Sequence, residues 1–197
     1  VHTELVSDGL IDLVESGVVN GVRKLHNRTK VVGTFALGTQ RLYDFIHENA
    51  AIELWSVSYV NSPILIARER NFVSVNATLA VDFLGQCASE TIGSRYFSSS
   101  GGQVDFARGA MYSDGGQGFM VLHSTAAGDT VSRIVPQLAP GTAVTTSKNT
   151  VDKVVTEYGV AELRARTISE RTNALIAIAH PKFRDELTAD ARRLGYI

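Results

Sequence analysis

A single glutamate near the start of the sequence gives the strongest indication of chemistry. Glu4 stands in the segment Val1-His2-Thr3-Glu4-Leu5-Val6-Ser7-Asp8-Gly9, where a β-like stretch leads into a turn. Most glutamates ahead of a helix are solvated or capping residues. A carboxylate that is held at the end of a strand, faces a cleft and is partly desolvated is instead a competent nucleophile toward a thioester. Glu4 is therefore our candidate nucleophile for an acyl-transfer reaction.

A double glycine could supply the oxyanion site that such a reaction needs. Gly101 and Gly102 end the small, polar segment Ser98-Ser99-Ser100-Gly101-Gly102. Because glycine has no Cβ atom, its backbone N–H can approach a ligand closely, as an oxyanion hole or a phosphate cradle requires. Most double glycines are ordinary turns. This one matches neither phosphate-binding fingerprint, since no G-x-x-x-x-G-K or G-x-G-x-x-G pattern follows a strand here.

Two further polar residues have both a structural and a functional interpretation. Asn61, ahead of Ser62 and Pro63, would by default form an Asx turn that caps the next helix, although its amide could instead orient a carboxylate or a carbonyl oxygen. Glu157, in Thr156-Glu157-Tyr158-Gly159, could be a second catalytic carboxylate. We favour a role for Glu157 in stabilising a strand-to-loop bend, and it is not in the predicted catalytic set.

The composition excludes several functional classes. The 197 residues are 44% hydrophobic and 20% charged, which is ordinary for a globular protein with a sizeable core. A net charge of -1 gives no electrostatic case for nucleic acid or an anionic membrane surface. No apolar run approaches the ~18 residues of a membrane span. The histidines lack metal-ligand spacing, and Ser124 lies in no G-x-S-x-G elbow, so we expect neither a metal site nor a serine hydrolase.

The cysteine usage indicates the compartment. Cys87 is the single cysteine, so no internal disulfide can form, which fits a reducing compartment and predicts a cytoplasmic protein. Cys87 lies in the apolar stretch 81–88 and is predicted to be a small core residue rather than a nucleophile.

Helix and strand patterns alternate over the first part of the chain. The predicted elements, in order, are a helix over 10–16 capped by Ser7 or Asp8, a strand over 31–37, a helical stretch carrying Leu42, Phe45 and Ile46, a strand over 54–60, and a helix over 63–70 that Pro63 starts.

Strand patterns then follow one another, and the end of the chain is helical. The β-rich segments are 72–75, 79–84, 119–122, 133–138 and 143–146, with loops over 98–102 and 114–118. Thr167-Ile168-Ser169-Glu170 is a capping box ahead of a helix that reaches His180. Pro181 opens a second helix, whose apolar stripe is Phe183, Leu187, Ala191 and Leu194. This order predicts an α/β domain with a mixed sheet and flanking helices.

Six segments together resemble the acetyl-CoA hydrolase/transferase family of coenzyme A transferases, which includes 4-hydroxybutyrate CoA-transferases and succinyl-CoA:acetate CoA-transferases. The segments are His2-Thr3-Glu4 with Ser7-Asp8-Gly9, residues 59–63, residues 101–110, residues 132–136, residues 154–163, and residues 178–181 with Phe183-Arg184. Each segment is a weak signal by itself. All six in the family's order are specific, and they run essentially from end to end of the chain.

The resemblance implies a fold, a reaction and a site. The fold would be a mixed-sheet domain of the NagB/RpiA/CoA-transferase-like type. Glu4 matches the family's reactive glutamate, which forms an acyl-glutamyl anhydride and then a glutamyl-CoA thioester, from which a new carboxylic acid collects the CoA. Asn61 matches the asparagine near that glutamate, Gly102 the donor of an oxyanion N–H, and Leu79 a position that lines the CoA site. The predicted catalytic residues are thus Glu4 and Asn61, and the predicted CoA-binding residues are Leu79, Gly101 and Gly102.

The resemblance also implies the partners. We expect acyl-CoA and a short-chain carboxylate as substrates, coenzyme A as a substrate rather than a bound cofactor, and a homodimer. Intact members are longer and have two similar α/β halves, and this chain matches the second half. It does not begin with methionine. We therefore expect residues 1–197 to be a single C-terminal domain of a longer two-domain chain, folded but inactive alone because the first half holds the rest of the oxyanion hole.

Two departures and two alternative functions remain open. Asp114 stands where many relatives carry a basic residue, which puts a phosphate contact in doubt, and His123 stands where a proline is common. A hydrolase, in which water intercepts the glutamyl thioester, would use the same glutamate, and no residue in this half decides between the two reactions. A non-catalytic interaction domain is the third possibility; the joint presence of Glu4, Asn61 and Gly101-Gly102 argues against it.

Overall fold

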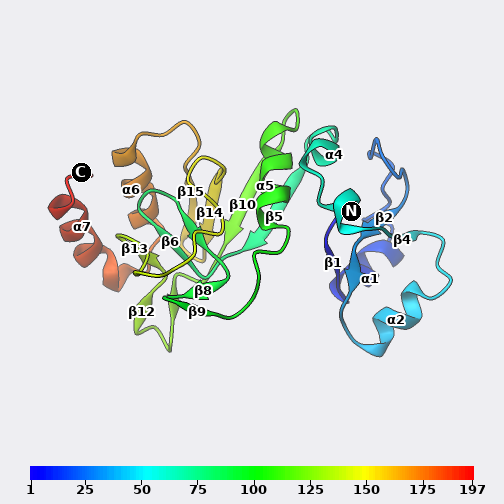
Figure 1. Ribbon diagram of the computed structural model, residues 1–197, viewed down its shortest axis with the longest axis horizontal. Helices are drawn as coiled ribbons and strands as arrows, with labels where there is room; N and C mark the ends of the chain where they lie inside the picture. Colours follow the sequence, from blue (N-terminus) through cyan, green and yellow to red (C-terminus); the bar gives the residue numbers. More distant parts are fainter.

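The computed structural model describes residues 1–197. Figure 1 shows the chain extended along one long axis. The N-terminal strands and helices lie at one end, a central sheet with helices beside it lies in the middle, and the C-terminal helices lie at the other end. None of the helices is long and apolar enough to span a membrane.

The N-terminal elements have a small core of their own. They are β1 (Leu5–Val6), α1 (Gly9–Glu15), β2 (Val31–Gly33), β3 (Phe35–Ala36), α2 (Gln40–Ile46) and β4 (Ile52–Leu54). β1 pairs in parallel with β3, and β2 with β4. Val6, Ile11, Val31 and Leu42 form the buried cluster. The predicted strand over 31–37 is divided at Thr34, because the N–H groups of Thr34 and Phe35 both donate to the Glu4 carbonyl.

Two short helices replace the strand that was predicted over 54–60. α3 (Val57–Val60) and α4 (Pro63–Ala67) follow β4, and of α3 only Val60 is buried. The strand prediction was wrong because apolar and polar residues alternate over this segment, while the backbone closes helical turns from Val60 and Asn61 back to Ser56 and Val57. α4 ends before the predicted Arg70, and Asn71 beyond it takes a positive φ of 54°.

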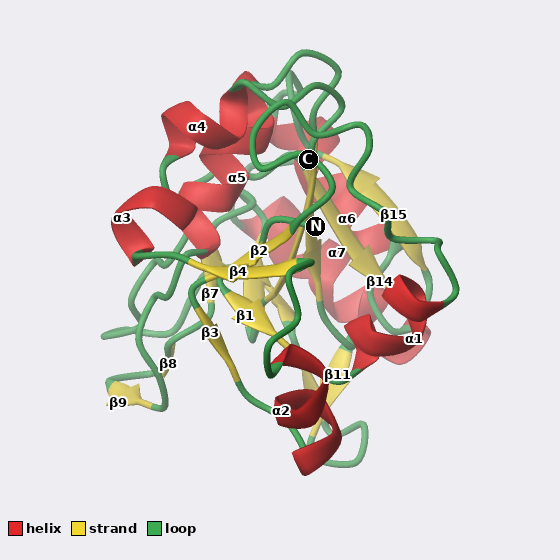
Figure 2. Ribbon diagram, turned by 90° about the vertical axis from the view of Figure 1, so that its right-hand side faces the viewer, coloured by secondary structure: helices red, strands yellow, loops and turns green.

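The central sheet is mixed, as predicted. Its order is β15 (Gly159–Glu162), β14 (Lys153–Thr156), β10 (Gln117–Val121) and β5 (Val73–Ala77). β10 runs parallel to both of its neighbours, and β15 returns antiparallel to β14. The helix α5 (Gln103–Tyr112) follows the double glycine and lies beside α4 (Figure 2). Neither α5 nor the β14–β15 hairpin was predicted from the sequence.

Short strands complete the middle of the chain. β6 (Ala80–Asp82) lies between β13 (Ile134–Val135) and β7 (Cys87–Ala88), while β8 (Thr91–Ile92) pairs with β9 (Arg95–Tyr96) and β11 (Thr125–Ala126) with β12 (Val131–Ser132). The segment 143–146 is not a strand; it makes one bridge, between Thr146 and Cys87. Cys87 is fully buried, which confirms its prediction as a core residue.

The C-terminal helices cover the main hydrophobic core. α6 (Ile168–Ala177) begins with the predicted capping box, in which Thr167 Oγ1 accepts from the Glu170 N–H and Glu170 Oε2 accepts from the Thr167 N–H. A 3₁₀ turn (Pro181–Phe183) leads into α7 (Arg184–Arg193). Leu187 and Ala191 are buried in a core of 17 residues, and Phe183 and Leu194 pack against it, so the predicted stripe is confirmed.

Candidate active site

Backbone hydrogen bonds on both sides of Glu4 fix its position. The Thr3 N–H donates to the Val32 carbonyl at 3.0 Å, and the Glu4 carbonyl accepts from the N–H groups of Thr34 at 2.9 Å and Phe35 at 3.1 Å. Glu4 therefore stands immediately before β1, in a segment that is hydrogen-bonded to residues 32–35 on both sides of it. Its side chain points toward the C-terminal end of α3 and the N-terminal end of α5.

The Glu4 carboxylate meets the amide of Asn61. Asn61 Nδ2 donates to Glu4 Oε2 at 2.6 Å across 57 positions of sequence. Asn61 is 8% exposed and ends α3. The Asx-turn interpretation was wrong, because Ser62 caps α4 by accepting from the Leu65 N–H at 3.3 Å. The Asn61 amide orients a carboxylate instead, and its buried Oδ1 has no hydrogen-bond partner within the chain.

The double glycine lies against this pair. A Cβ atom at Gly102 would stand 2.4 Å from Glu4 Oε2 and 2.5 Å from Asn61 Nδ2, distances that real Cβ atoms do not adopt. At Gly101 the backbone has a φ of +53°, and a Cβ atom would lie 3.5 Å from Glu4 Oε1. The structure thus brings Glu4, Asn61, Gly101 and Gly102 together, and the close approach of Gly102 requires a residue without a side chain.

Gly102 is also the N-cap of α5, which the sequence reasoning missed. The first N–H groups of an α-helix have no partner inside the helix, and the aligned peptide dipoles make this end electropositive. The Glu4 carboxylate and any oxyanion formed beside it therefore lie at a favourable helix end. Asp105, in the first turn of α5, is a second negative charge near Glu4. The pKa of Asp105 is raised, chiefly by burial and to a smaller extent by the charge of Glu4, while Arg108 lowers it.

A cavity of about 580 Å³ opens in front of Glu4. It lies between the N-terminal strand, β5 and α5, and its lining combines Glu4 and Gly102 with the apolar side chains of Phe72, Val73 and Phe106. Neither lysine nor arginine lines it. β5 is an edge strand of the central sheet, and Val73 on it is 54% exposed, so this wall of the cavity has apolar surface open to solvent.

Leu79 lies elsewhere. It lines a second cavity of about 560 Å³ with His123, Arg133 and Glu157, and this cavity shares no lining residue with the first. Its position follows the carboxyl ends of the parallel strands β5, β10 and β14, which is where open α/β sheets bind ligands. The structure does not place Leu79 beside Glu4, and its assignment to the CoA site remains a prediction.

Other polar residues make structural contacts. Glu157 accepts from the Ser124 Oγ at 2.5 Å and from the Ser124 N–H at 3.0 Å, which agrees with a role in stabilising the bend after β14. Asp114 pairs with Arg70 at 2.9 Å on the surface. No group of three or more His, Cys, Asp or Glu side chains is arranged to hold a metal ion.

Comparison with known proteins decides the family. The sequence profile described as "Acetyl-CoA hydrolase/transferase C-terminal domain" matches residues 38–191. The chain belongs to the acetyl-CoA hydrolase/transferase family. This confirms the resemblance inferred from the six segments, and in this family Glu4, Asn61 and Gly102 lie on the segments that carried it.

Named relatives cover the chain almost completely. The chain is 57% identical to succinyl-CoA:cyclohexane-1-carboxylate CoA transferase of Geobacter metallireducens over 100% of its own length and 45% of that protein. It is 49% identical to 4-hydroxybutyrate coenzyme A transferase of Clostridium kluyveri over 98% of its length and 45% of that protein. Proteins named acetyl-CoA hydrolase are more distant family members, at 29% and 30% identity.

A solved structure of the family has the same fold. The crystal structure of 4-hydroxybutyrate CoA-transferase from Porphyromonas gingivalis superposes with a TM-score of 0.85 and 42% identity, over 98% of this chain and 45% of that one. The chain thus spans less than half the length of the family members that it matches.

Proposed function

We propose that this chain is the C-terminal half of a CoA-transferase that moves coenzyme A between an acyl-CoA and a short-chain carboxylate, with Glu4 as the nucleophile. The observation that carries the proposal is the carboxylate of Glu4, held by Asn61 Nδ2 at 2.6 Å and lying against Gly102 at the N-terminus of α5. A carboxylate that is held in position beside backbone N–H donors has the two components of acyl transfer, a nucleophile and an oxyanion site.

In the first step, a Glu4 carboxylate oxygen attacks the thioester carbonyl carbon of the acyl-CoA. The carbonyl oxygen becomes an oxyanion, which the N–H of Gly102 and the helix end stabilise. The C–S bond then breaks, CoA leaves as its thiolate, and Glu4 is left as a mixed acyl-glutamyl anhydride. The Asn61 amide keeps one carboxylate oxygen in place, so that the other is presented to the substrate.

In the second step, the CoA thiolate attacks the glutamyl carbonyl carbon of the anhydride. The original acyl group departs as a free carboxylate, and Glu4 carries CoA as a glutamyl thioester. A new carboxylate then attacks this thioester, releases the thiolate and forms a second anhydride. Attack of the thiolate on the new acyl carbonyl yields the product acyl-CoA and restores the Glu4 carboxylate.

The proposal includes a partner for the open side of the site. We propose that a first half of the same longer chain covers the apolar wall at β5 and supplies the rest of the oxyanion hole, and that the intact enzyme is a homodimer with no permanently bound cofactor. Because one oxyanion donor contributes ~10²–10³ in rate, this chain alone should fold without measurable turnover. Equal rates for this chain and the full-length protein would contradict that expectation.

A second candidate function is supported by the family itself, which includes proteins named acetyl-CoA hydrolase. In that reaction water, rather than a carboxylate, attacks the glutamyl-CoA thioester. The two functions differ in what happens without an acceptor, since a hydrolase releases free CoA steadily and a transferase does not.

The experiment that tests the proposal is kinetic. In the full-length protein, we expect Glu4→Gln to abolish both CoA transfer and thioester cleavage, because an amide is not a comparable nucleophile, while the fold measured by circular dichroism is unchanged. Consumption of acetyl-CoA beyond one equivalent per site should depend on an added short-chain carboxylate, with the CoA recovered as the new acyl-CoA and not as free CoA. Near wild-type transfer by Glu4→Gln would refute the nucleophile assignment, and acceptor-independent release would favour the hydrolase.

A further inference from the structure

His2 links the same two segments that the Glu4–Asn61 hydrogen bond links. Its Nε2 lies 2.7 Å from the Val60 carbonyl oxygen, across 58 positions of sequence. His2 is two residues before Glu4, and Val60 is the residue before Asn61. The hydrogen bond between Glu4 and Asn61 is therefore accompanied by a second hydrogen bond between the same two segments, from His2 to Val60, which uses neither of their side chains.

The protonation state of His2 follows from its partner. A carbonyl oxygen only accepts hydrogen bonds, so Nε2 must carry the proton. The ring is half-buried and stands 6.0 Å from the Phe106 ring. Burial lowers the pKa of His2, and the positive charges of Lys24 and of the N-terminus lower it further, while the Val60 carbonyl and the charge of Glu69 raise it by smaller amounts. Neutral His2 with its proton on Nε2 is then the form that donates to Val60 near pH 7.

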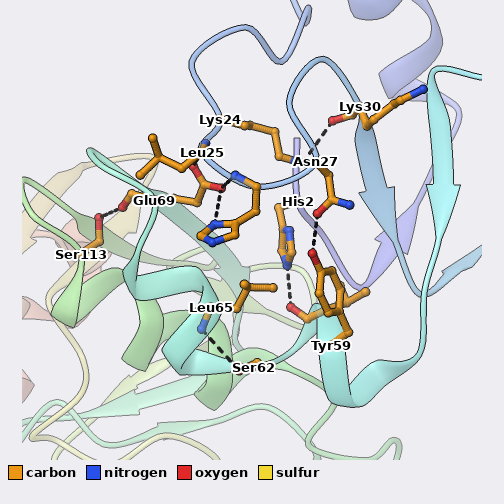
Figure 3. A network of polar contacts seen from close by, with 12 residues as sticks. His2, Lys24, Leu25, Asn27, Lys30, Tyr59, Ser62, Leu65, Glu69 and Ser113 are labelled. Atoms are coloured by element: carbon orange, nitrogen blue, oxygen red, sulfur yellow. Dashed lines mark hydrogen bonds and ion pairs between the residues drawn. The ribbon is translucent and has the colours of Figure 1, made fainter.

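The segment that carries the acceptor, Val60, is also hydrogen-bonded to a second loop (Figure 3). Tyr59, the neighbour of Val60, donates its OH to Asn27 Oδ1 at 2.7 Å. The loop that carries Asn27 is held by the buried Glu69 carboxylate, which accepts from the N–H groups of Leu25 at 2.7 Å and His26 at 2.9 Å. α3 is thus hydrogen-bonded to His2 through Val60 and to the 25–27 loop through Tyr59.

The same loop also holds the donor end. Lys24 Nζ donates to the carbonyl oxygen of Lys30 at 3.1 Å (Figure 3). It also donates to the carbonyl oxygen of Val1 at 3.1 Å. Val1, the neighbour of His2, and Tyr59, the neighbour of Val60, are therefore both hydrogen-bonded to the loop over residues 24–27. The His2–Val60 hydrogen bond itself spans the gap between the Glu4 segment and α3, which is the same gap that the Glu4–Asn61 hydrogen bond spans.

We propose that His2 is a positioning residue for the reaction of Glu4: its hydrogen bond to Val60 sets the distance between the Glu4 strand and the Asn61 helix. The inference rests on the proposed function, because it assigns a catalytic consequence to that distance. His2 would act through Asn61 and contribute no proton to the chemistry.

The test compares two substitutions in the full-length protein, with the rate of CoA-adduct formation from acetyl-CoA followed by quenched mass spectrometry. His2→Phe keeps the ring and removes the donor, whereas His2→Gln replaces the ring and keeps a donor at a similar reach. We expect His2→Phe to lower the adduct-forming rate at least ~10-fold, since a misplacement of about 1 Å can cost ~10²-fold. His2→Gln should recover most of that loss, and KM for acetyl-CoA should change far less than the rate.

The control removes an equivalent hydrogen bond away from the site. Thr188 Oγ1 donates to the Arg184 carbonyl at 2.7 Å within α7. Thr188→Val should leave the adduct-forming rate unchanged even if it lowers the melting temperature. A slow His2→Phe with a fast Thr188→Val of equal stability would separate positioning from general destabilisation.

A double variant shows whether His2 acts through Asn61. If it does, His2→Phe combined with Asn61→Ala should be no slower than Asn61→Ala alone, because the same function is removed twice. Multiplied losses, or a wild-type rate for His2→Phe, would overturn the inference while leaving the proposed function intact. A full rate for Glu4→Gln would overturn the proposed function itself, so the two failures are distinguishable.

Discussion

Replacement of Gly102 by alanine is the most informative single perturbation of the site geometry. An alanine Cβ would stand 2.4 Å from Glu4 Oε2 and 2.5 Å from Asn61 Nδ2. The backbone of Gly102, at φ −86° and ψ 6°, is accessible to alanine, so the substitution should not strain the chain itself. The clash falls on the two side chains, and to regain ordinary contact each must withdraw by about 1 Å. A misplacement of this size at a reacting group can cost ~10²-fold in rate.

The expected signature of Gly102→Ala in the full-length protein is a loss of turnover with little loss of stability. kcat for CoA transfer should fall by about 10²-fold, while unfolding free energy changes by no more than about 1 kcal/mol, the usual size of an N-cap effect. Gly9→Ala is the matched control, since Gly9 also begins a helix and a Cβ atom there would meet nothing within 4 Å. Turnover of Gly102→Ala within a fewfold of wild type would refute the close contact between Gly102 and the Glu4–Asn61 pair.

Three further predictions concern the fold around the site. Thr167→Ala removes the side-chain cap of α6 and should lower the unfolding free energy by about 1 kcal/mol in a urea titration; no change would contradict the capping-box geometry. Leu175→Ala, at a fully buried position, should cost about 2–5 kcal/mol in the same assay. Because burial lowers the folded-state pKa of His2, the unfolded chain takes up a proton first as pH falls, so stability should decrease below about pH 6.5. His2→Gln should lessen that decrease, and an identical pH dependence in the variant would count against it.

Local signals in the sequence were sufficient for the C-terminal helices. The Thr167–Glu170 capping box and the stripe through Leu187 and Ala191 are formed by residues three or four positions apart, so they could be recognised without the tertiary structure. The helix α5 was missed although its buried residues Gln103, Phe106, Ala107 and Ala110 have helical spacing. A double glycine before it, Gly109 within it and a buried Gln103 weakened the pattern. Because the helix was not predicted, the position of Gly102 at its N-terminus was not predicted either.

The site itself needed the tertiary structure. Family resemblance identified Glu4, Asn61 and Gly102 as separate points, but the bond from Asn61 to Glu4 spans 57 positions and depends on how α3 docks against β1. Asn61 and Ser62 are equally plausible helix caps in sequence, and only the hydrogen bond from Leu65 shows that Ser62 is the cap. Apolar and polar residues alternate over 54–60, which is typical of a strand with one buried face. Residues 57–60 instead form a short, mostly exposed helix, in which only Val60 is buried. Leu79 shows the converse limit, since a matched position does not reveal which of two cavities it lines.

The central claim is that Glu4 becomes covalently attached to coenzyme A, and peptide mapping tests it most directly. The full-length protein is incubated with acetyl-CoA without an acceptor, quenched in mild acid, digested and analysed by mass spectrometry. The account predicts that the peptide containing Glu4 carries one CoA joined with loss of water, that the adduct disappears when a carboxylate acceptor is added, and that Glu4→Gln forms none. An adduct on any other residue, or an undiminished adduct in Glu4→Gln, would contradict it.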